Sequence, residues 1–187
     1  TPLYTLSLHD ALPISTTILR SADGGENWNG TDAAAVTGEV YGISRGPLDD
    51  DVFVAVGELG RVYRSTDAGQ VWALAATPAA VSLRAVTRCT GALVAVGDDG
   101  AVFRSTTNGV SWDDQTPGGD ITMDLLGVAG WTSTVIAVGA GGAIARSTDA
   151  GISWELIDSP TTANLRAVTR SPSGRWTAAG DDGVIVQ

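Results

Sequence analysis

The chain has 187 residues, 43% of them hydrophobic, with 24 Gly and 7 Pro, so it is neither collagen-like nor disordered and can bury a core. All 11 basic residues are Arg, and 21 acidic residues bring the formal charge to -10, a balance that repels phosphate backbones and excludes nucleic acid as an expected partner. The single cysteine, Cys89, excludes an internal disulfide framework and a multi-cysteine zinc site. The sequence contains no run of 18 or more apolar residues, so it predicts no membrane-spanning helix.

The first residues do not read as native protein. Thr5 to Ile14 match, codon by codon, one reading frame of a short-read sequencing adapter, and the start has neither an initiator Met nor the basic region of a signal peptide. We therefore expect residues 1–15 to be an artefact, and residues 16–187 to be a fragment of a longer protein. His9, the only histidine, falls in the excluded part, which leaves no histidine-dependent chemistry.

A repeat of about 40 residues organises the remaining chain. Four tryptophans each close the pattern S-x-D-x-G-x-x-W, and we call the four copies boxes 1 to 4. Their marked residues are Ser21, Asp23, Gly25 and Trp28; Ser65, Asp67, Gly69 and Trp72; Ser105, Gly109 and Trp112; and Ser147, Asp149, Gly151 and Trp154. In box 3, Thr107 replaces the acid and Asn108-Gly109 follows, so we expect the turn to survive there by another hairpin chemistry.

Two more columns recur at the same period. Gly-x-x-Gly stands at residues 57–60, 97–100, 139–142 and 180–183, which predicts hairpin turns because glycine accepts the positive φ that such turns need. The other column opens each unit with its first strand, at residues 40–43, 83–86, 125–128 and 165–168. The second strands, such as residues 52–56 and 93–96, are apolar on both faces, which predicts burial between stacked sheets.

The columns together predict an all-β fold, a β-propeller of four-stranded antiparallel blades. The Gly-x-x-Gly turn should join the second strand to the third, and the box should join the third to the fourth. The chain then holds a partial arc of about four to five blades in one domain. The expected units are residues 16–31 (partial), 36–75, 82–115, 121–157 and 164–187 (partial).

The boxes are expected to be architecture, with no catalytic, metal or cofactor role. The Asp carboxylate can accept backbone N–H bonds across the turn, the Gly can take the left-handed conformation, and the Trp can pack under the hairpin. The acidic runs 49–51, 98–99 and 181–182 lack the alternating spacing of a calcium loop and are interpreted as solvated hairpin tips. Cys89 is expected to be a buried small residue.

Nine of the eleven arginines fall into three repeat columns, and Arg45 stands in the same column as Arg88 and Arg170. Arg20, Arg64, Arg104 and Arg146 immediately precede the boxes, and we expect them to bind neighbouring carboxylates or carbonyls. The first-strand arginines Arg84, Arg88, Arg166 and Arg170 form the candidate binding site for a protein or peptide with a carboxylate or acidic tail. Surface or inter-blade salt bridges are the alternative for these four side chains.

These residues resemble the BNR or Asp-box repeat, and the longer unit L-R-x-V followed by V-x-V-G-x-x-G-x-V-x-R-S-x-D-x-G-x-x-W resembles the photosystem II assembly and stability factor family and its bacterial relatives. The resemblance implies a non-catalytic, extracytoplasmic scaffold whose arginine-rich patch holds a partner's tail. Tyr41 and Leu126 depart from that patch in the other units. A glycosidase propeller, sialidase-like or xyloglucanase-like, and a surface sugar-binding or adhesion module are the alternatives.

Overall fold

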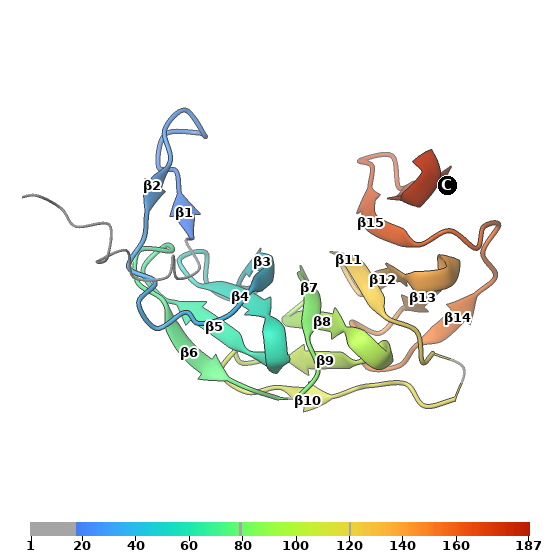
Figure 1. The fold of residues 1–187 in the computed structure, drawn as a ribbon, viewed down its shortest axis with the longest axis horizontal. Helices are drawn as coiled ribbons and strands as arrows, with labels where there is room; N and C mark the ends of the chain where they lie inside the picture. The colour runs from blue at the N-terminus through green and yellow to red at the C-terminus, as the bar shows by residue number, and fades with distance from the viewer. Residues whose placement is uncertain (1–17, 79, 120) are drawn as a thin grey trace, which may run out of the picture.

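The structure, a computed structural model, describes residues 18–78, 80–119 and 121–187, and the proposed adapter segment lies outside this part of the chain. Its strands form five antiparallel sheets that follow one another around an open arc (Figure 1). In every sheet the strands pair in chain order, so each sheet is a simple meander. The predicted β-propeller of four-stranded blades is confirmed, and the chain contains part of its ring.

Three sheets are complete blades. Blade 1 consists of β3 (Val40–Arg45), β4 (Phe53–Gly57), β5 (Val62–Ser65) and β6 (Ala73–Ala76). Blade 2 consists of β7 (Leu83–Cys89), β8 (Ala92–Gly97), β9 (Val102–Ser105) and β10 (Asp113–Asp114). Blade 3 consists of β11 (Leu125–Trp131), β12 (Thr134–Gly139), β13 (Ile144–Ser147) and β14 (Glu155–Ile157).

The two ends of the arc carry incomplete blades. Blade 0 has only β1 (Leu19–Arg20) and β2 (Asn29–Gly30), which flank box 1 and correspond to third and fourth strands. Blade 4 has β15 (Leu165–Arg170), β16 (Trp176–Gly180) and β17 (Ile185–Val186), which correspond to the first three strands. The expected order of two strands, three whole blades and three strands is therefore what the chain forms.

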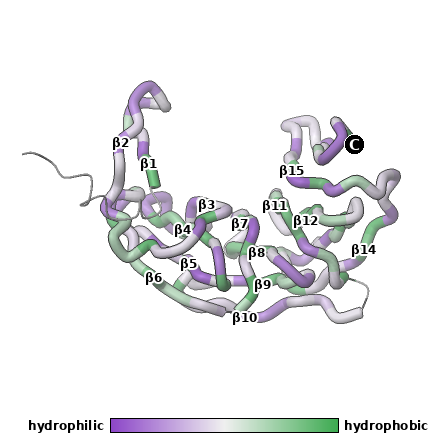
Figure 2. The backbone as a smooth tube through the Cα atoms, viewed as in Figure 1, coloured by the Kyte–Doolittle hydropathy of each residue, from purple (hydrophilic) through white to green (hydrophobic). Residues whose placement is uncertain are grey.

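Burial falls from the middle of each blade to its outer edge. The second strands are nearly sealed, with every residue of β8 buried, because both faces of a blade pack on its neighbours. The fourth strands β6, β10 and β14 are mostly exposed and form the outer rim. In Figure 2, hydrophobic segments recur along the strands within the blades, whereas the box 1 loop between β1 and β2 is hydrophilic.

The core consists of clusters shared by neighbouring blades. Val54 and Val56 of blade 1 pack in one cluster with Leu93 and Ala95 of blade 2. A second cluster joins blade 2 to blade 3, and a third joins blade 3 to blade 4. Because each blade buries its apolar faces only against its neighbours, the stability of the arc is a property of successive blade pairs.

The Gly-x-x-Gly column forms the predicted turn between the second and third strands, and its second glycine has the predicted positive φ, whereas its first glycine does not. The segments are single turns of 3-10 helix, η2 (Glu58–Gly60), η3 (Asp98–Gly100), η4 (Ala140–Gly142) and η5 (Asp181–Gly183). The first glycine is extended, as in Gly97 with φ -164, and the positive φ falls on the third and fourth positions, as in Asp99 with φ 57 and Gly100 with φ 70. A Cβ on Gly97 would overlap the carbonyl oxygen of Ser82, so the first glycine is required by close backbone approach.

Candidate functional site

The first strands of the blades line the concave side of the arc. β3, β7, β11 and β15 stand at the inner end of their sheets, and each contacts the next one around the arc (Figure 1). One position of this inner face carries Tyr41, Arg84, Leu126 and Arg166 in successive blades. In each of blades 1 to 4 a β-bulge follows the first residue of the inner strand. The backbone therefore presents this position in the same way in every blade.

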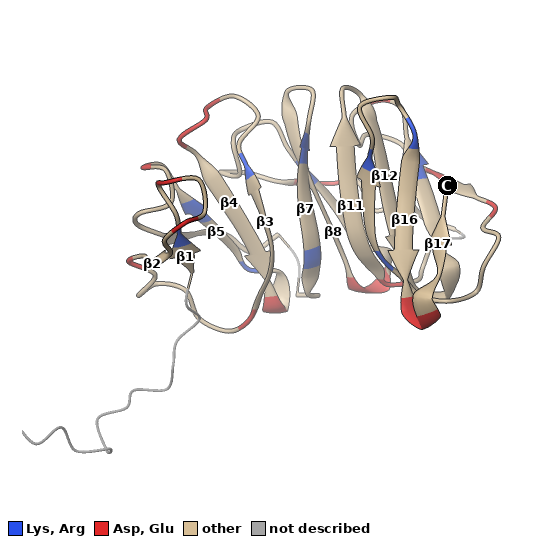
Figure 3. Ribbon diagram, turned by 90° about the horizontal axis from the view of Figure 1, so that it is seen from above, with Lys and Arg blue, Asp and Glu red and all other residues tan. Residues whose placement is uncertain are grey.

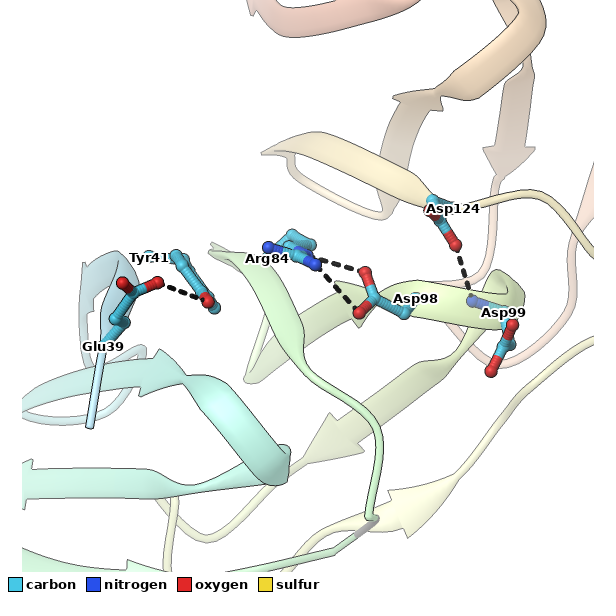
Figure 4. Close-up of polar contacts among 6 residues, drawn as sticks. All are labelled: Glu39, Tyr41, Arg84, Asp98, Asp99 and Asp124. Carbon is cyan, nitrogen blue, oxygen red and sulfur yellow. Dashed lines mark hydrogen bonds and ion pairs between the residues drawn. The ribbon is translucent and has the colours of Figure 1, made fainter. Parts of the chain in front are cut away.

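Arg84 is fixed in place by two neighbours. Its Nε donates to Oδ1 of Asp98 at 2.6 Å and its Nη2 donates to Oδ2 of the same carboxylate at 2.9 Å (Figure 4). The guanidinium carbon lies 4.6 Å from the ring centroid of Tyr41 in blade 1, a cation–π contact. The hydroxyl of Tyr41 donates to Oε2 of Glu39 at 2.7 Å. The bond to Asp98 raises the pKa of Arg84, and the bond to Glu39 raises the pKa of Tyr41.

Arg166 repeats the pairing in blade 4. Its Nε and Nη2 both bond to the carboxylate of Asp181, the latter at 2.9 Å, and Nδ2 of Asn164 donates to the same carboxylate at 3.0 Å. The Arg166 guanidinium is the main cause that lowers the pKa of Asp181. Within the described residues Nη1 of Arg84 and Nη1 of Arg166 have no hydrogen-bond acceptor. Within the described residues, the Nη1 atom of each guanidinium is therefore left as a hydrogen-bond donor.

Arg88 and Arg170 do not join the other two in one patch. Arg84 and Arg88 lie near opposite ends of β7, which places them about 13 Å apart along the strand at about 3.3 Å per residue; Figure 3 shows the two basic positions of β7 well separated. Arg170 lies with its guanidinium carbon 4.5 Å from the centroid of Trp131, and Arg88 is exposed. The four predicted residues thus form two levels, with Arg84 and Arg166 at the η-turn end of the strands.

The interpretation of residues 98–99 and 181–182 as solvated tips is wrong for Asp98 and Asp181, which are the partners of the inner arginines. The repeat itself carries a signal that could have found them. Blades with Arg in the inner position have Asp at the first position of the η turn, whereas blade 3 has Leu126 and Ala140. Acidic residues gather at this end of the blades (Figure 3), and the backbone N–H of Asp99 donates to Oδ1 of Asp124 at 3.0 Å.

The boxes act as the predicted structural turns. In box 2, Oγ of Ser65 accepts from N–H of Gly69 and donates to Oδ1 of Asp67, which in turn accepts from the N–H groups of Gln70 and Val71. The glycines of all four boxes are left-handed, at φ 95, 84, 82 and 85. In box 3, Oγ1 of Thr107 accepts from N–H of Ser111 at 2.9 Å, so the turn survives without the acid.

Each box tryptophan donates its indole N–H to the carbonyl of the box glycine, as Trp72 does to Gly69 at 3.1 Å. Trp72 is 3% exposed, whereas Trp28 is 61% exposed, so the prediction that every Trp packs under its hairpin is wrong for box 1. Box 1 belongs to the incomplete blade 0, and the described chain has no preceding blade to cover it. Cys89 is buried as expected, and desolvation raises the pKa of its thiol.

The arginines that precede the boxes tie neighbouring blades together. Nε of Arg20, Arg64 and Arg104 donates to a main-chain carbonyl in the box of the following blade, namely that of Ala68, Asn108 and Ala150, at 2.6 to 2.8 Å. Arg146 instead donates to Oε1 of Glu155 within its own blade at 2.9 Å. The expected pairing with carbonyls or carboxylates is confirmed, and three of the four bonds cross between blades.

The comparisons with known proteins agree with this geometry. Residues 48–168 match the family described as the DUF6242 beta propeller domain. The chain belongs to this family. The curated proteins contain no match to it.

Solved propellers of several kinds resemble this DUF6242 propeller. YCF48 bound to D1 peptide has a TM-score of 0.65 at 20% identity, over 77% of this chain and 48% of that one. YCF48 from Cyanidioschyzon merolae has a TM-score of 0.64 at 20% identity, over 77% and 51%. An ancestral GH74 enzyme has a TM-score of 0.65 at 20% identity, over 87% of this chain and 24% of that one. The chain thus spans about half the length of the YCF48 chains, and these likenesses show the fold.

No helix in residues 18–78, 80–119 and 121–187 has the length and apolar character needed to cross a bilayer. The same residues contain no group of three or more His, Cys, Asp or Glu side chains placed to hold a metal ion.

The box carboxylates should make the DUF6242 propeller less stable at acid pH. Bonds from the side chain and backbone of Ser153 hold the pKa of Asp149 at about 2, below its ordinary 3.8. Because the folded pKa is the lower one, the stabilisation is complete above pH 3.8 and is lost as the pH falls through about 2. We expect the melting temperature of Asp149→Asn to fall less steeply over this interval than that of the wild type.

Circular dichroism melts of both proteins across this pH interval measure the effect. Asp113→Asn removes an exposed carboxylate outside the boxes and serves as the control for charge. Parallel curves for Asp149→Asn and the wild type would contradict the assignment of acid sensitivity to this box.

Proposed function

We propose that this propeller is a non-catalytic scaffold that binds an extended segment of a partner protein on the inner face of the arc, and that Arg84 and Arg166 contact a carboxylate of that segment. The observation that carries the proposal is the pair of inner guanidinium groups, each held through Nε and Nη2 by an aspartate of its own blade. A guanidinium held in this way is pre-organised, so it loses little side-chain entropy when Nη1 binds a ligand.

The local charge sets a limit on the ligand. Asp98 and Asp181 offset the charge of the two arginines, so a highly acidic peptide would meet repulsion from the acidic residues of the η turns. One carboxylate at each arginine, such as a chain terminus or an acidic side chain, fits the remaining hydrogen-bond donors better. Tyr41 adds an aromatic face beside Arg84, which suits an apolar neighbour of that carboxylate.

The likeness to YCF48 bound to D1 peptide supports a protein or peptide ligand for the same architecture. The extracytoplasmic location belongs to this proposal as well, and secretion of the native protein with a cleaved leader would test it.

A glycosidase is the second candidate because GH74 enzymes share the fold. A glycosidase needs a general acid with a raised pKa opposite a second carboxylate. Four carboxyl groups in the described residues have a pKa that departs from the ordinary value, and in each the pKa is lowered. They belong to Asp23, Asp67, Asp149 and Asp181. Release of reducing sugar from xyloglucan by the chain would favour the enzyme over the scaffold.

The double variant Arg84→Ala/Arg166→Ala tests the proposal. Charge-assisted hydrogen bonds contribute about 1.5 kcal/mol or more each, so we expect the double variant to bind at least about tenfold more weakly. The probe is a fluorescent octapeptide with apolar residues and a free C-terminal carboxylate, followed by anisotropy. The melting temperature should change little, because ion pairs this exposed contribute only about 0–1 kcal/mol each.

Arg45→Ala/Arg175→Ala is the matched control, since it also removes two positive charges but away from the inner η-turn end. Arg45 pairs with the exposed Asp50, and Arg175 is exposed. Equal loss of binding in both double variants would show that the effect comes from the loss of two positive charges and not from the position of Arg84 and Arg166. A large loss of stability in Arg84→Ala/Arg166→Ala with binding retained would make these arginines structural.

A further inference from the structure

A pocket of about 280 Å³ lies between blades 2 and 3, at the end of the inner strands opposite the η turns. The hairpins that join the first strand to the second in these two complete blades supply most of its lining. They contribute Arg88, Cys89 and Thr90 from blade 2 and Gly130, Trp131 and Thr132 from blade 3. The smallest ligand pockets in proteins have a volume of roughly 300 Å³, so this pocket suits a ligand of about one ring.

Blade 3 departs from the repeat in two adjacent positions at this pocket. In the other blades these positions hold Arg and then a small residue, namely Arg45-Gly46, Arg88-Cys89 and Arg170-Ser171. Blade 3 has Gly130 and Trp131 instead, in the same register against the second strand as the residues of blade 2. Trp131 is 54% exposed, so its ring does not serve the core. An aromatic side chain left in solvent where the other blades need none is a candidate for contact with a ligand.

Gly130 brings the two hairpins close together. A Cβ at this position would overlap the carbonyl oxygen of Arg88, so the inner strand of blade 3 has no room for a side chain here. The N–H of Gly130 donates to Oγ1 of Thr87 at 3.1 Å, and the N–H of Thr90 donates to the carbonyl of Thr132 at 2.8 Å. These bonds fix the walls of the pocket, and they occupy two main-chain donors that a peptide strand would need for pairing.

The turn after Trp131 has a strained backbone. Thr132 has φ 50, a left-handed value that β-branched residues rarely adopt, whereas the hairpin of blade 2 places its positive φ on Gly91. Oγ1 of Thr132 donates to the carbonyl of Trp131 at 2.6 Å, and the carbonyl of Ser133 accepts from the N–H of Ala150 at 2.8 Å. Strained backbone that its surroundings hold in place is concentrated at binding sites. Here it fixes the direction in which Trp131 leaves the strand.

Arg170 supports the ring of Trp131 from the blade 4 side. Its guanidinium carbon lies 4.5 Å from the ring centroid, a cation–π contact. The pocket lies on the blade 2 side of the same tryptophan, and Arg88 forms part of its opposite wall. An indole ring held in this way loses little side-chain entropy when a second ring stacks on it from the pocket.

Arg88 adds a positive charge without a partner. Within the described residues its guanidinium has no hydrogen-bond acceptor and no ion pair, and the acid of the neighbouring loop, Asp50, is bound by Arg45 at 2.7 Å. The hairpins at residues 88–92, 130–134 and 170–176 contain no Asp or Glu, whereas acidic residues gather at the η-turn end of the blades (Figure 3). This end of blades 2 to 4 is therefore locally positive on a chain with a formal charge of -10, which favours an anionic ligand.

We propose that this pocket binds a sugar residue that carries a carboxylate, such as a uronic acid unit of an acidic glycan, with its C–H face on Trp131 and its carboxylate on Arg88. The C–H groups of a pyranose ring carry a partial positive charge that suits the negative face of the indole. The guanidinium of Arg88 can donate to both carboxylate oxygens. Thr90 and Thr132 add exposed hydroxyl groups beside the pocket for the hydroxyl groups of the sugar.

The site is suited to binding a sugar and not to cleaving it. Among the described residues that line the pocket there is no Asp or Glu, whereas glycoside hydrolysis ordinarily uses two carboxyl groups. Arg88 and Trp131 lie at the opposite end of the inner strands from Arg84 and Arg166. An acidic sugar and the octapeptide therefore test two separate sites.

Isothermal titration calorimetry of the 187-residue chain tests the proposal with trigalacturonic acid and with galactotriose of the same linkage, which lacks the carboxylates. We expect the wild type to bind the acidic sugar at least about tenfold more tightly than the neutral one. Trp131→Ala should weaken the binding of both sugars at least about tenfold, because both stack on the ring. Arg88→Gln should weaken only the acidic sugar, to the affinity of the neutral one.

Trp28→Ala and Arg146→Gln are the matched controls, because both change exposed side chains of the same types outside the pocket. Both variants should bind trigalacturonic acid as the wild type does. Melting curves by circular dichroism check that Trp131→Ala and Arg88→Gln are folded, which we expect because both side chains are exposed.

Equal affinity of the wild type for the two sugars would overturn the role of Arg88, and no saturable binding of either sugar at up to about 10 mM would overturn the site itself. Equal losses in Arg88→Gln and Arg146→Gln would show an effect of net charge and would also overturn the proposal. An amidated triglutamate peptide is the remaining probe. If it bound as tightly as trigalacturonic acid and lost affinity in Trp131→Ala and Arg88→Gln, the pocket would be a site for acidic peptides and not for sugars.

Discussion

Gly97→Ala is expected to destabilise the propeller by about 3 kcal/mol or more, because overpacking against immobile backbone is among the most costly core changes. The added Cβ would overlap the carbonyl oxygen of Ser82 and lie 3.0 Å from Cα of Leu83, and neither backbone atom can move without shifting β7. Urea unfolding followed by tryptophan fluorescence measures the change in the free energy of unfolding.

Gly118→Ala is the control for this substitution. A Cβ on Gly118 meets nothing within 4 Å and its φ is not positive, so the same methyl group should leave the midpoint of unfolding nearly unchanged. A cost below about 1 kcal/mol for Gly97→Ala would contradict the close-approach explanation.

The turn geometry of the boxes was predictable because the bonds among their marked residues are local. The hydroxyl of Ser147, the carboxylate of Asp149 and the N–H of Gly151 meet within five residues, so the sequence pattern contains these hydrogen bonds. The blade order followed from the period alone, since the same columns recur four times in phase. The cross-blade bonds of the pre-box arginines were predicted in kind, although their acceptors could be named only from the structure.

The inner site was less predictable because its contacts join different columns and different blades. Arg84 meets Asp98 across 14 positions of sequence and meets Tyr41 from the preceding blade, so no single column shows the arrangement. Tyr41 was interpreted as a departure from the arginine patch, whereas in the structure it supports Arg84. The exposure of Trp28 was missed for a related reason, since burial of a box depends on the blade before it.

Leu125→Ala is expected to cost about 2–5 kcal/mol, the usual range for truncating a sealed leucine. Leu125 opens β11, is fully buried, and packs in the cluster that joins blades 2 and 3, so the cavity would form at a junction where Val96 and Val102 have no freedom to collapse inward. Urea unfolding gives the midpoint and the slope of the transition. Leu48→Ala, at a side chain that is 62% exposed, is the control and should cost less than about 0.5 kcal/mol.

Because adjacent blades stabilise one another, a lower midpoint with an unchanged slope would show that the arc still unfolds as one unit. A reduced slope would mean that this junction uncouples the two sides of the arc. A cost under about 1 kcal/mol would refute the view that Leu125 helps to hold blades 2 and 3 together.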